Sequence, residues 1–513
     1  MIRFHRPLAS AVLVVLTACS GEPPTPPSGT DAPRPGLLPA REVRVIPQIG
    51  VPAELEPAWE FPPLQTELPR VDLEISSSEY SAMLSNVTSN VRRDAEFRAD
   101  GFRTPIQMRL RGASARHFPK KSYKVYFPDG VRWQGRTKLN LVAEYQDATM
   151  MAEKFAYDLL AAMRVRAPRA TYVRLYLNGR YQGVYLDIEQ VDKRFLRSHE
   201  FADLDGNIYR CGWKDCEMKT WQVPYQGDWA KKTNETEPDD DLHEFLCMVN
   251  HTPEPVFAAT LAERLELESY LRSMVMDTLT SNNFVEDSES FLVHDRLTGK
   301  WSYVPWDLNN VDSRWWVGVS IPYKPKPVHP IFSFSLLDGW TETMYQNRKD
   351  KHPGYLPVYS NLHTRVVFNA DLRERLLVLF ERAFREVFEP SSVQARIDAM
   401  YALLEPHMKD DPYIDFAKFQ AAKTYFKNFF TGRDTFVRAE LDKFRARGLE
   451  LAIEAVDPRA GWIELKNHGT NPVDLGGRTL TTNLRRPFGR NLPSRRLEPG
   501  QSVRLEASRL GLT

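Results

Sequence analysis

The chain of 513 residues contains only four cysteines, Cys19, Cys211, Cys216 and Cys247, which are too few for a disulfide-stabilised scaffold of this length. It also lacks an excess of either charge, because 68 Lys and Arg residues face 67 Asp and Glu residues. Nucleic-acid binding that rests on surplus positive charge is therefore not expected. With 42% apolar residues, the chain is long enough for about three globular domains.

The amino terminus indicates an export signal. Basic residues among positions 1–6 precede a short apolar run, and Cys19 follows that run. The segment from Leu16 to Cys19 resembles a bacterial lipobox, which implies cleavage before Cys19 and lipidation of that residue. An ordinary signal peptide with an incidental cysteine is the alternative. Because Ser20 follows, the resemblance favours the outer membrane as the destination.

A proline-rich segment separates this signal from the rest of the chain. Residues 20–69 contain 13 of the 37 prolines. Proline lacks an amide donor and fixes φ, so this composition predicts an extended tether rather than helix or sheet.

Two local patterns organise the first half of the body. Small residues at 112–115 lie between two predicted strands, and a basic cluster that includes Lys120 and Lys121 follows them. Such a loop allows amides to approach a phosphate that a lysine can also reach, although a plain hairpin is the alternative. Further on, Asn178 and Gly179 between two aromatic runs predict a hairpin with a type I′ turn.

A helix is predicted over residues 148–163, where four apolar residues from Met151 to Met163 are spaced four apart. Glu153 lies off this stripe. It is interpreted either as an acid that pairs with a strand lysine, as in kinases, or as a solvated surface residue.

A candidate metal site follows a predicted strand over residues 301–306. Asp307 ends this strand and Asn309 comes two residues later. Carboxylate and amide oxygens are the ligands that Mg²⁺ prefers, and one or two carboxylates are enough when substrate phosphates complete the shell. Asp295, in the turn before this strand, is interpreted as an exposed hairpin residue.

Five segments in this order resemble the CotH kinase family over roughly residues 70–445. They are Arg111–Ser114 with Phe118–Tyr123, Leu139–Leu141 with Asp147, Leu177–Gly179 with Tyr181–Tyr185 and Glu189, Ser290–Phe291, and Gly299–Lys300 through Asn309. The resemblance implies an α+β class with an atypical, two-lobed protein-kinase-like fold. It also implies ATP, Mg²⁺ or Mn²⁺, and phosphoryl transfer to Ser or Thr of a protein.

The resemblance also implies roles for single residues. Lys121 would bind the nucleotide phosphates, with Lys124 as second choice because a strand places the two on opposite faces. Arg111 and Ser114 would contribute from the loop. Glu189 would lie on the hinge side of the nucleotide, and Asp307 and Asn309 would bind the metal.

Two departures from the family pattern favour an inactive, surface-binding protein as the competing hypothesis. Asn309 stands where the family usually has Asp. The family's catalytic Asp comes two residues after an Asn, whereas here the nearest acids, Glu286 and Asp287, are displaced. Asp287 is the predicted base and Glu286 its alternative.

The carboxyl-terminal part divides near residue 448. Apolar periodicity predicts helices within 372–444, and short strands follow. The segments Trp462–Asn467, Val473–Gly477 and Leu497–Gly500 resemble parts of a lamin-tail domain, an Ig-like β-sandwich, in incomplete form. The expected domains are therefore a signal peptide (1–19), a linker (20–69), a kinase-like domain (70–447) and a partial β domain (448–513).

The sequence thus predicts an exported, lipid-anchored kinase with a protein substrate on the cell surface or coat, without a nucleic-acid partner. Outside the cytoplasm, the spacing of Cys211 and Cys216 allows them to close a small disulfide loop, with Cys247 as the odd thiol.

Overall fold

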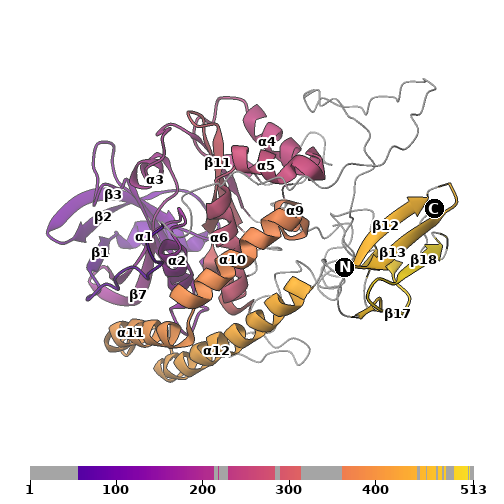
Figure 1. Ribbon diagram of the computed structural model, residues 1–513. Coiled ribbons are helices and arrows are strands. Elements are labelled where there is room, and N and C mark those ends of the chain that lie inside the picture. The colour runs from indigo at the N-terminus through magenta and orange to yellow at the C-terminus, as the bar shows by residue number, and fades with distance from the viewer. Residues whose placement is uncertain are drawn as a thin grey trace.

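The computed structural model describes residues 56–212, 218, 229–282, 289–313, 361–446, 451–457, 459–468, 472–476, 479–480, 490–506 and 508 (Figure 1). The fold is mixed, with two sheets and a set of helices in one body and a small group of strands after it. Among the described helices, none combines the length and the apolar character required to cross a bilayer.

A closed barrel forms the amino-terminal part of the body, with strand order β1-β2-β3-β4-β5-β7-β6. Its strands are β1 (Arg70–Glu74), β2 (Arg93–Ala99), β3 (Phe102–Leu110), β4 (Tyr123–Tyr126), β5 (Lys138–Val142), β6 (Ala170–Leu177) and β7 (Arg180–Ile188). β1 and β6 pair in parallel and the other neighbours are antiparallel. Alternate residues of the strands fill the barrel, as the period of two requires.

The β6–β7 connection is the predicted two-residue hairpin. Asn178 has φ 49° and Gly179 has φ 75°, which are the two left-handed positions of a type I′ turn. The Asn178 side chain also accepts from the Ile75 amide at 2.8 Å and donates to the Ile75 carbonyl at 2.9 Å. The turn therefore also fixes the chain that leaves β1.

Short helices connect the barrel strands. They are α1 (Ser77–Ser85), η1 (Ser114–His117), which is a single 3₁₀ turn, and α2 (Ala152–Ala162). The predicted helix over 148–163 thus begins later than expected. Asp147 accepts from the amides of Thr149 and Ala152 at 2.8 and 2.9 Å, so residues 147–151 form the turn that starts the helix.

A second sheet of order β11-β10-β8-β9 and the remaining helices complete the body. The strands are β8 (Asn207–Cys211), β9 (Trp229–Lys231), β10 (Glu289–Asp295) and β11 (Lys300–Trp306). The helices are α3 (Lys193–Ser198), α4 (Asp240–His251), α5 (Glu254–Arg264), α6 (Leu267–Thr280), η2 (Leu308–Ser313), α9 (Asn361–Phe368), α10 (Ala370–Glu386), α11 (Pro390–Met408) and α12 (Phe416–Ala446). One apolar core includes α2, α6, the second sheet and α10 to α12.

The last part of the predicted tether belongs to this body. Trp59 is 1% exposed, and the guanidinium groups of Arg272 and Arg382 lie 5.2 and 4.4 Å from the centre of its ring. Leu68 is also buried. The expectation that residues 20–69 are all linker is therefore wrong for residues 56–69, because Trp59 and Leu68 are buried in the folded body.

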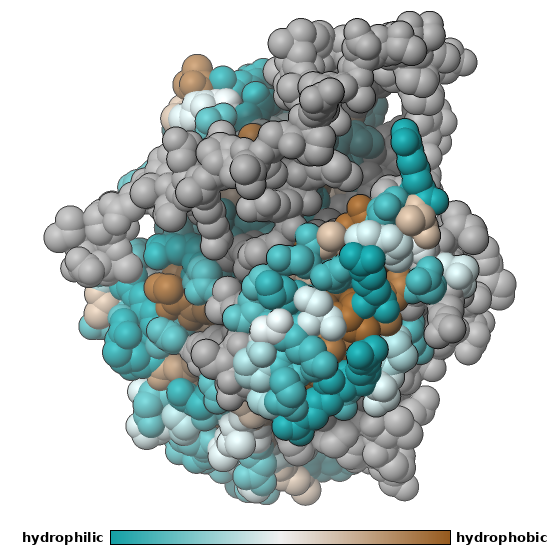
Figure 2. All heavy atoms as spheres, turned by 45° about the vertical axis from the view of Figure 1, so that its right-hand side comes forward, coloured by the Kyte–Doolittle hydropathy of each residue, from teal (hydrophilic) through white to brown (hydrophobic). Residues whose placement is uncertain are grey.

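The strands after residue 450 have a separate apolar core, which includes Leu451, Leu465 and Leu497. A three-stranded sheet contains β12 (Leu451–Asp457), β13 (Trp462–Asn467) and β18 (Ser502–Glu506). Two further pairs are β14 (Val473–Asp474) with β17 (Arg496–Leu497), and β15 (Thr479–Leu480) with β16 (Arg490–Asn491). On the face shown in Figure 2, apolar residues form small patches among hydrophilic ones. The Ig-like assignment stays a prediction.

Candidate functional site

Asp307 lies where β11 ends and η2 begins. Its backbone has φ 57°, a left-handed conformation that is uncommon outside glycine but that Asp tolerates better than most residues. The next amide, that of Leu308, donates to Glu153 Oε1 at 3.2 Å, and Asn309 Nδ2 donates to Asp307 Oδ1 at 3.1 Å. Burial raises the pKa of Asp307, and the positive charges of Arg111 and Arg210 oppose this rise.

Glu153 is 3% exposed on α2, so the interpretation of this residue as a solvated surface acid is wrong. Its carboxyl group is hydrogen-bonded to that of Glu144, which is also buried and has φ 47° in the loop after β5. Burial raises the pKa of Glu144 to about 7 and raises the pKa of Glu153 well above its usual range. The charge of Asp307 raises both pKa values further, and two carboxyl groups this close favour retaining a proton.

Glu289 contributes a fourth carboxyl group from the first residue of β10. Burial and the negative charge of Asp307 raise its pKa to about 7, although it forms an ion pair with Arg210 on β8. We call Glu144, Glu153, Glu289 and Asp307 the acid cluster. Among the described residues, Arg111 and Arg210 are the basic side chains whose charge acts on this cluster, so its four carboxyl groups lie near two guanidinium groups there.

Lys124 lies beside these cationic neighbours. It is on β4 opposite Arg109 of β3 and Asn140 of β5, so the three share the face of the sheet that points away from the barrel core. Its Nζ donates to Gln190 Oε1 at 2.5 Å. Burial lowers the pKa of Lys124 to about 7, and the charges of Arg111 and Arg210 are among the further causes. The structure therefore brings Lys124, Arg111 and the surroundings of Asp307 together.

Lys121 and Lys120 have other partners. Lys121 Nζ donates to the Arg116 carbonyl at 2.8 Å, inside its own loop, and burial lowers the pKa of Lys121. Lys120 is fully buried and donates to the Val184 carbonyl at 2.7 Å and to Asp411 Oδ2 at 2.8 Å. Of the lysines in this region, Lys124 rather than Lys121 is the one that neighbours the cations of the acid cluster.

The other residues expected near the nucleotide have different surroundings. Ser114 is exposed at the start of η1, on the expected loop between β3 and β4. The Glu189 carboxylate accepts from Ser198 Oγ at 2.7 Å, from the amide of Arg169 at 3.2 Å and lies 2.9 Å from His199 Nε2. These hydrogen bonds lower the pKa of Glu189 although burial opposes them, and they anchor α3 to the end of β7.

Several predicted residues fall outside the described residues. They are Cys19, Cys216, Glu286 and Asp287. The Cys211–Cys216 pairing therefore stays a prediction. Cys247 is disulfide-bonded, as is Cys211, so the expectation of an odd thiol at Cys247 is wrong.

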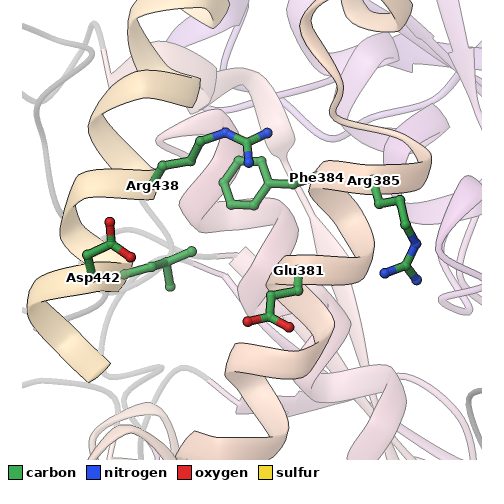
Figure 3. Close-up of a pocket in the computed structure, with 6 residues that line it drawn as sticks. Glu381, Phe384, Arg385, Arg438 and Asp442 are labelled. Atoms are coloured by element: carbon green, nitrogen blue, oxygen red, sulfur yellow. The ribbon is translucent and has the colours of Figure 1, made fainter. Parts of the chain in front are cut away.

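A surface pocket of about 350 Å³ lies between α10 and α12 (Figure 3). Glu381, Phe384 and Arg385 line one side, and Arg438, Leu441 and Asp442 line the other. The guanidinium of Arg438 lies 4.0 Å from the Phe384 ring centre and is paired with Asp434. This pocket contains acids and bases in equal number and none of the acid cluster, so we do not assign the chemistry to it.

A family model described as CotH kinase protein matches residues 108–437, which is more than half of the chain. The chain belongs to the CotH kinase protein family. The inner spore coat protein H of Bacillus subtilis (strain 168) is 23% identical over 357 residues, which cover 68% of this chain and 90% of that relative. The matched range of the CotH family includes Arg111, Lys124, Arg210 and the whole acid cluster.

Sequence reasoning did not find Glu144, Glu289 or Arg210. Glu289 and Arg210 lie at or next to the end of a strand, as Asp307 does, and Glu144 lies two residues beyond β5, so nearness to a strand end was the available signal. What sequence reasoning could not provide is the pairing of strands and helices that brings these ends together.

Proposed function

We propose that this CotH family protein transfers the γ-phosphoryl group of ATP to a Ser or Thr hydroxyl of a protein, on a kinase-like two-lobed fold. The observation that carries the proposal is that, among the described residues around Asp307, carboxyl groups outnumber the guanidinium groups near them, and that Lys124 lies beside those guanidinium groups. A buried surplus of negative charge is costly unless a cation or protons neutralise it. The raised pKa values of Glu144, Glu153 and Glu289 express this cost.

The residues present fit Mg²⁺ or Mn²⁺. Asp307 would bind the ion through its carboxylate and Asn309 through Oδ1, since Asn309 Nδ2 already donates to Asp307. When bound, the ion would neutralise charge on the transferring phosphoryl group. The chain itself would bind and orient the phosphates through Lys124 and Arg111, with Lys121 as the alternative lysine.

The proposed reaction moves one phosphoryl group. The hydroxyl oxygen of the substrate forms a bond to the γ-phosphorus, the bond from that phosphorus to the β–γ bridging oxygen breaks, and ADP leaves. The hydroxyl proton passes to an acceptor, for which Asp287 is proposed and Glu286 is the alternative. Most of the rate enhancement would come from positioning and from charge neutralisation.

The test combines binding and transfer on one preparation of the protein. Calorimetry should detect Mg²⁺-dependent ATP binding, and γ-labelled ATP should label the protein itself or an added protein such as casein. Chelation by EDTA should abolish both signals. If the parent protein neither binds Mg-ATP nor transfers label, the kinase proposal is rejected.

A second function, a surface-binding protein with an inactive kinase-like site, is favoured by Asn309. This residue provides an amide where the CotH family resemblance leads one to expect a second carboxylate, and it donates to Asp307. ATP binding without any transfer of label, to the protein or to casein, would favour this candidate.

The proposed location is the cell surface or coat, with a protein substrate there and a lipid anchor on Cys19. The name of the Bacillus subtilis relative, a spore coat protein, supports a surface or coat location. Cys19→Ser should release the protein from the membrane fraction, because the acylated residue is lost. Unchanged fractionation of this variant would reject the anchor.

A further inference from the structure

Glu153 has no lysine among its hydrogen-bond partners in the described structure, unlike the helix acid expected of a kinase. Oε1 accepts from the main-chain amide of Leu308 at 3.2 Å, and the carboxyl group is also hydrogen-bonded to Glu144. The residue is 3% exposed on α2, and α2 packs directly on η2. A buried side chain on a rigid helix thus contacts the peptide that follows Asp307.

That peptide has an unusual conformation. Asp307 is in the left-handed region with φ 57°, which is uncommon outside glycine even though Asp tolerates it better than most residues. Surrounding contacts help to hold a residue other than glycine in this conformation. The Leu308 amide belongs to the same peptide unit as the Asp307 carbonyl, so the orientation of this peptide and the direction of the Asp307 side chain are coupled.

We propose that Glu153 is a positioning residue, which fixes the Asp307–Leu308 peptide through its acceptor oxygen and so directs the Asp307 carboxylate toward a divalent cation. This inference rests on the proposed function, because it assigns Asp307 to the metal. It adds to the proposed function a division of roles, in which Asp307 would bind the ion and Glu153 would orient Asp307.

The alternative role for Glu153 is that of a direct metal ligand, and the two roles require different atoms. Positioning needs only a neutral acceptor oxygen for Leu308 and a group that can donate to Glu144. A glutamine supplies both, since its carbonyl oxygen accepts and its amide nitrogen donates. As a direct ligand, Glu153 would supply a negative charge to the cation, and glutamine, which can coordinate only through a neutral oxygen as proposed for Asn309, would bind it more weakly.

The experiment measures the affinity for Mn²⁺ alone, by electron paramagnetic resonance of the free ion, in the full chain. The variants are Glu153→Gln, Glu153→Leu and Glu153→Met, the last in case the branched side chain prevents folding. Asp158→Asn is the matched control, because Asp158 is also buried on α2 but forms ion pairs with Lys154 and Arg396. Thermal melting of each variant checks the fold.

Removal of a residue that orients a metal ligand typically costs about 10- to 100-fold in affinity, so the Leu and Met variants should bind Mn²⁺ at least about tenfold more weakly. Glu153→Gln and Asp158→Asn should stay close to the parent protein. Parent-like binding by both apolar variants would overturn the positioning role. A loss in Glu153→Gln as large as that in the apolar variants would overturn it in favour of a direct ligand.

The failure of the proposed function has a different signature. If the parent protein does not bind Mn²⁺ in the absence or presence of ATP, both the metal site and the positioning role are rejected. If the parent protein binds the ion and the variants behave other than expected, only the role of Glu153 is rejected.

Discussion

Two groups of buried charges in the same body differ in balance. Lys120 and Asp411 form a pair, and Asp411 accepts in addition from the amides of Val184 and Tyr413. The acid cluster has four carboxyl groups beside Arg111 and Arg210. A balanced and fully hydrogen-bonded pair can be structural, whereas a surplus of one sign requires a ligand or bound protons. Balance therefore separates the charges that support the fold from those proposed to act on a substrate.

The structural character of the first group is also visible at Gly183 on β7. A Cβ atom at this position would lie 1.9 Å from Asp411 Oδ2, and the residue has φ +100°. Only glycine allows the connection between α11 and α12 to approach the barrel this closely. Lys120, Gly183 and Asp411 thus join the barrel to the carboxyl-terminal helices.

The largest effect is expected for Lys120→Met, which breaks the balance of the first group. It leaves the Asp411 carboxylate buried without its cation, and breaking such a pair typically costs about 3–5 kcal/mol. Denaturant unfolding should show this loss, while Lys121→Met, on the partly exposed neighbour, should change the free energy of unfolding by less than about 1 kcal/mol. Equal losses in the two variants would show that the buried ion pair contributes no more to the free energy of unfolding than a partly exposed lysine does.

A large effect on rate rather than stability is expected for Asp307→Ala. Removing one preorganised electrostatic group should lower Mg²⁺-dependent phosphoryl transfer by at least about two powers of ten, or roughly 3 kcal/mol. The matched control is Asp295→Asn, in the same β10–β11 hairpin, where the carboxylate accepts from the amides of Ala202 and Asp203. The control should melt earlier but transfer phosphate at the parent rate. A parent-like rate in Asp307→Ala would remove this residue from the site.

The pH dependence of stability tests the surplus in the acid cluster directly. The pKa of Glu289 in the folded protein is about 7, above the value of about 4.3 expected in the unfolded chain. The stabilising contribution is therefore fully present below pH 4.3, and it is lost as the pH rises through about 7. As the pH rises from 5 to 8, the unfolding midpoint of the parent protein should fall. The midpoint of Glu289→Gln should fall less. Saturating Mg²⁺ should reduce this fall in the parent protein. A fall of the same size in Glu289→Gln would contradict the assignment of the pH dependence to Glu289.

Local features of the fold were predictable from the sequence. Asn178 and Gly179 specify their turn by themselves, because few other residue pairs adopt two left-handed conformations. The apolar stripe of α2 and the position of Asp307 after a strand are likewise local patterns. The region expected from the resemblance to the CotH family, roughly residues 70–445, contains the residues 108–437 that the family model matches.

Contacts between distant segments were not predictable. The hydrogen bond from Leu308 to Glu153 joins residues 155 positions apart, and the one from Lys120 to Asp411 joins residues 291 positions apart. Asp295 was expected to be exposed, but it is 6% exposed because the chain around Ala202 returns to it. A sequence pattern reports the period of one element, whereas burial of a charged residue depends on which element packs against it.

The smallest effects are expected for the two lysines near the site, Lys124 and Lys121, and their difference tests which of them would bind the phosphates. Lys124 lies among the cations beside the acid cluster, whereas Lys121 Nζ donates to a carbonyl of its own loop. A hydrogen bond to a charged group is worth about 1.5–3 kcal/mol, so Lys124→Ala should weaken Mg-ATP binding by about tenfold or more in calorimetry. Lys121→Ala should weaken it by only a few-fold, about what a nearby screened charge contributes. A larger loss for Lys121→Ala would mean that the loop opens to deliver Lys121 to the phosphates, and that the face of β4 is not the phosphate site.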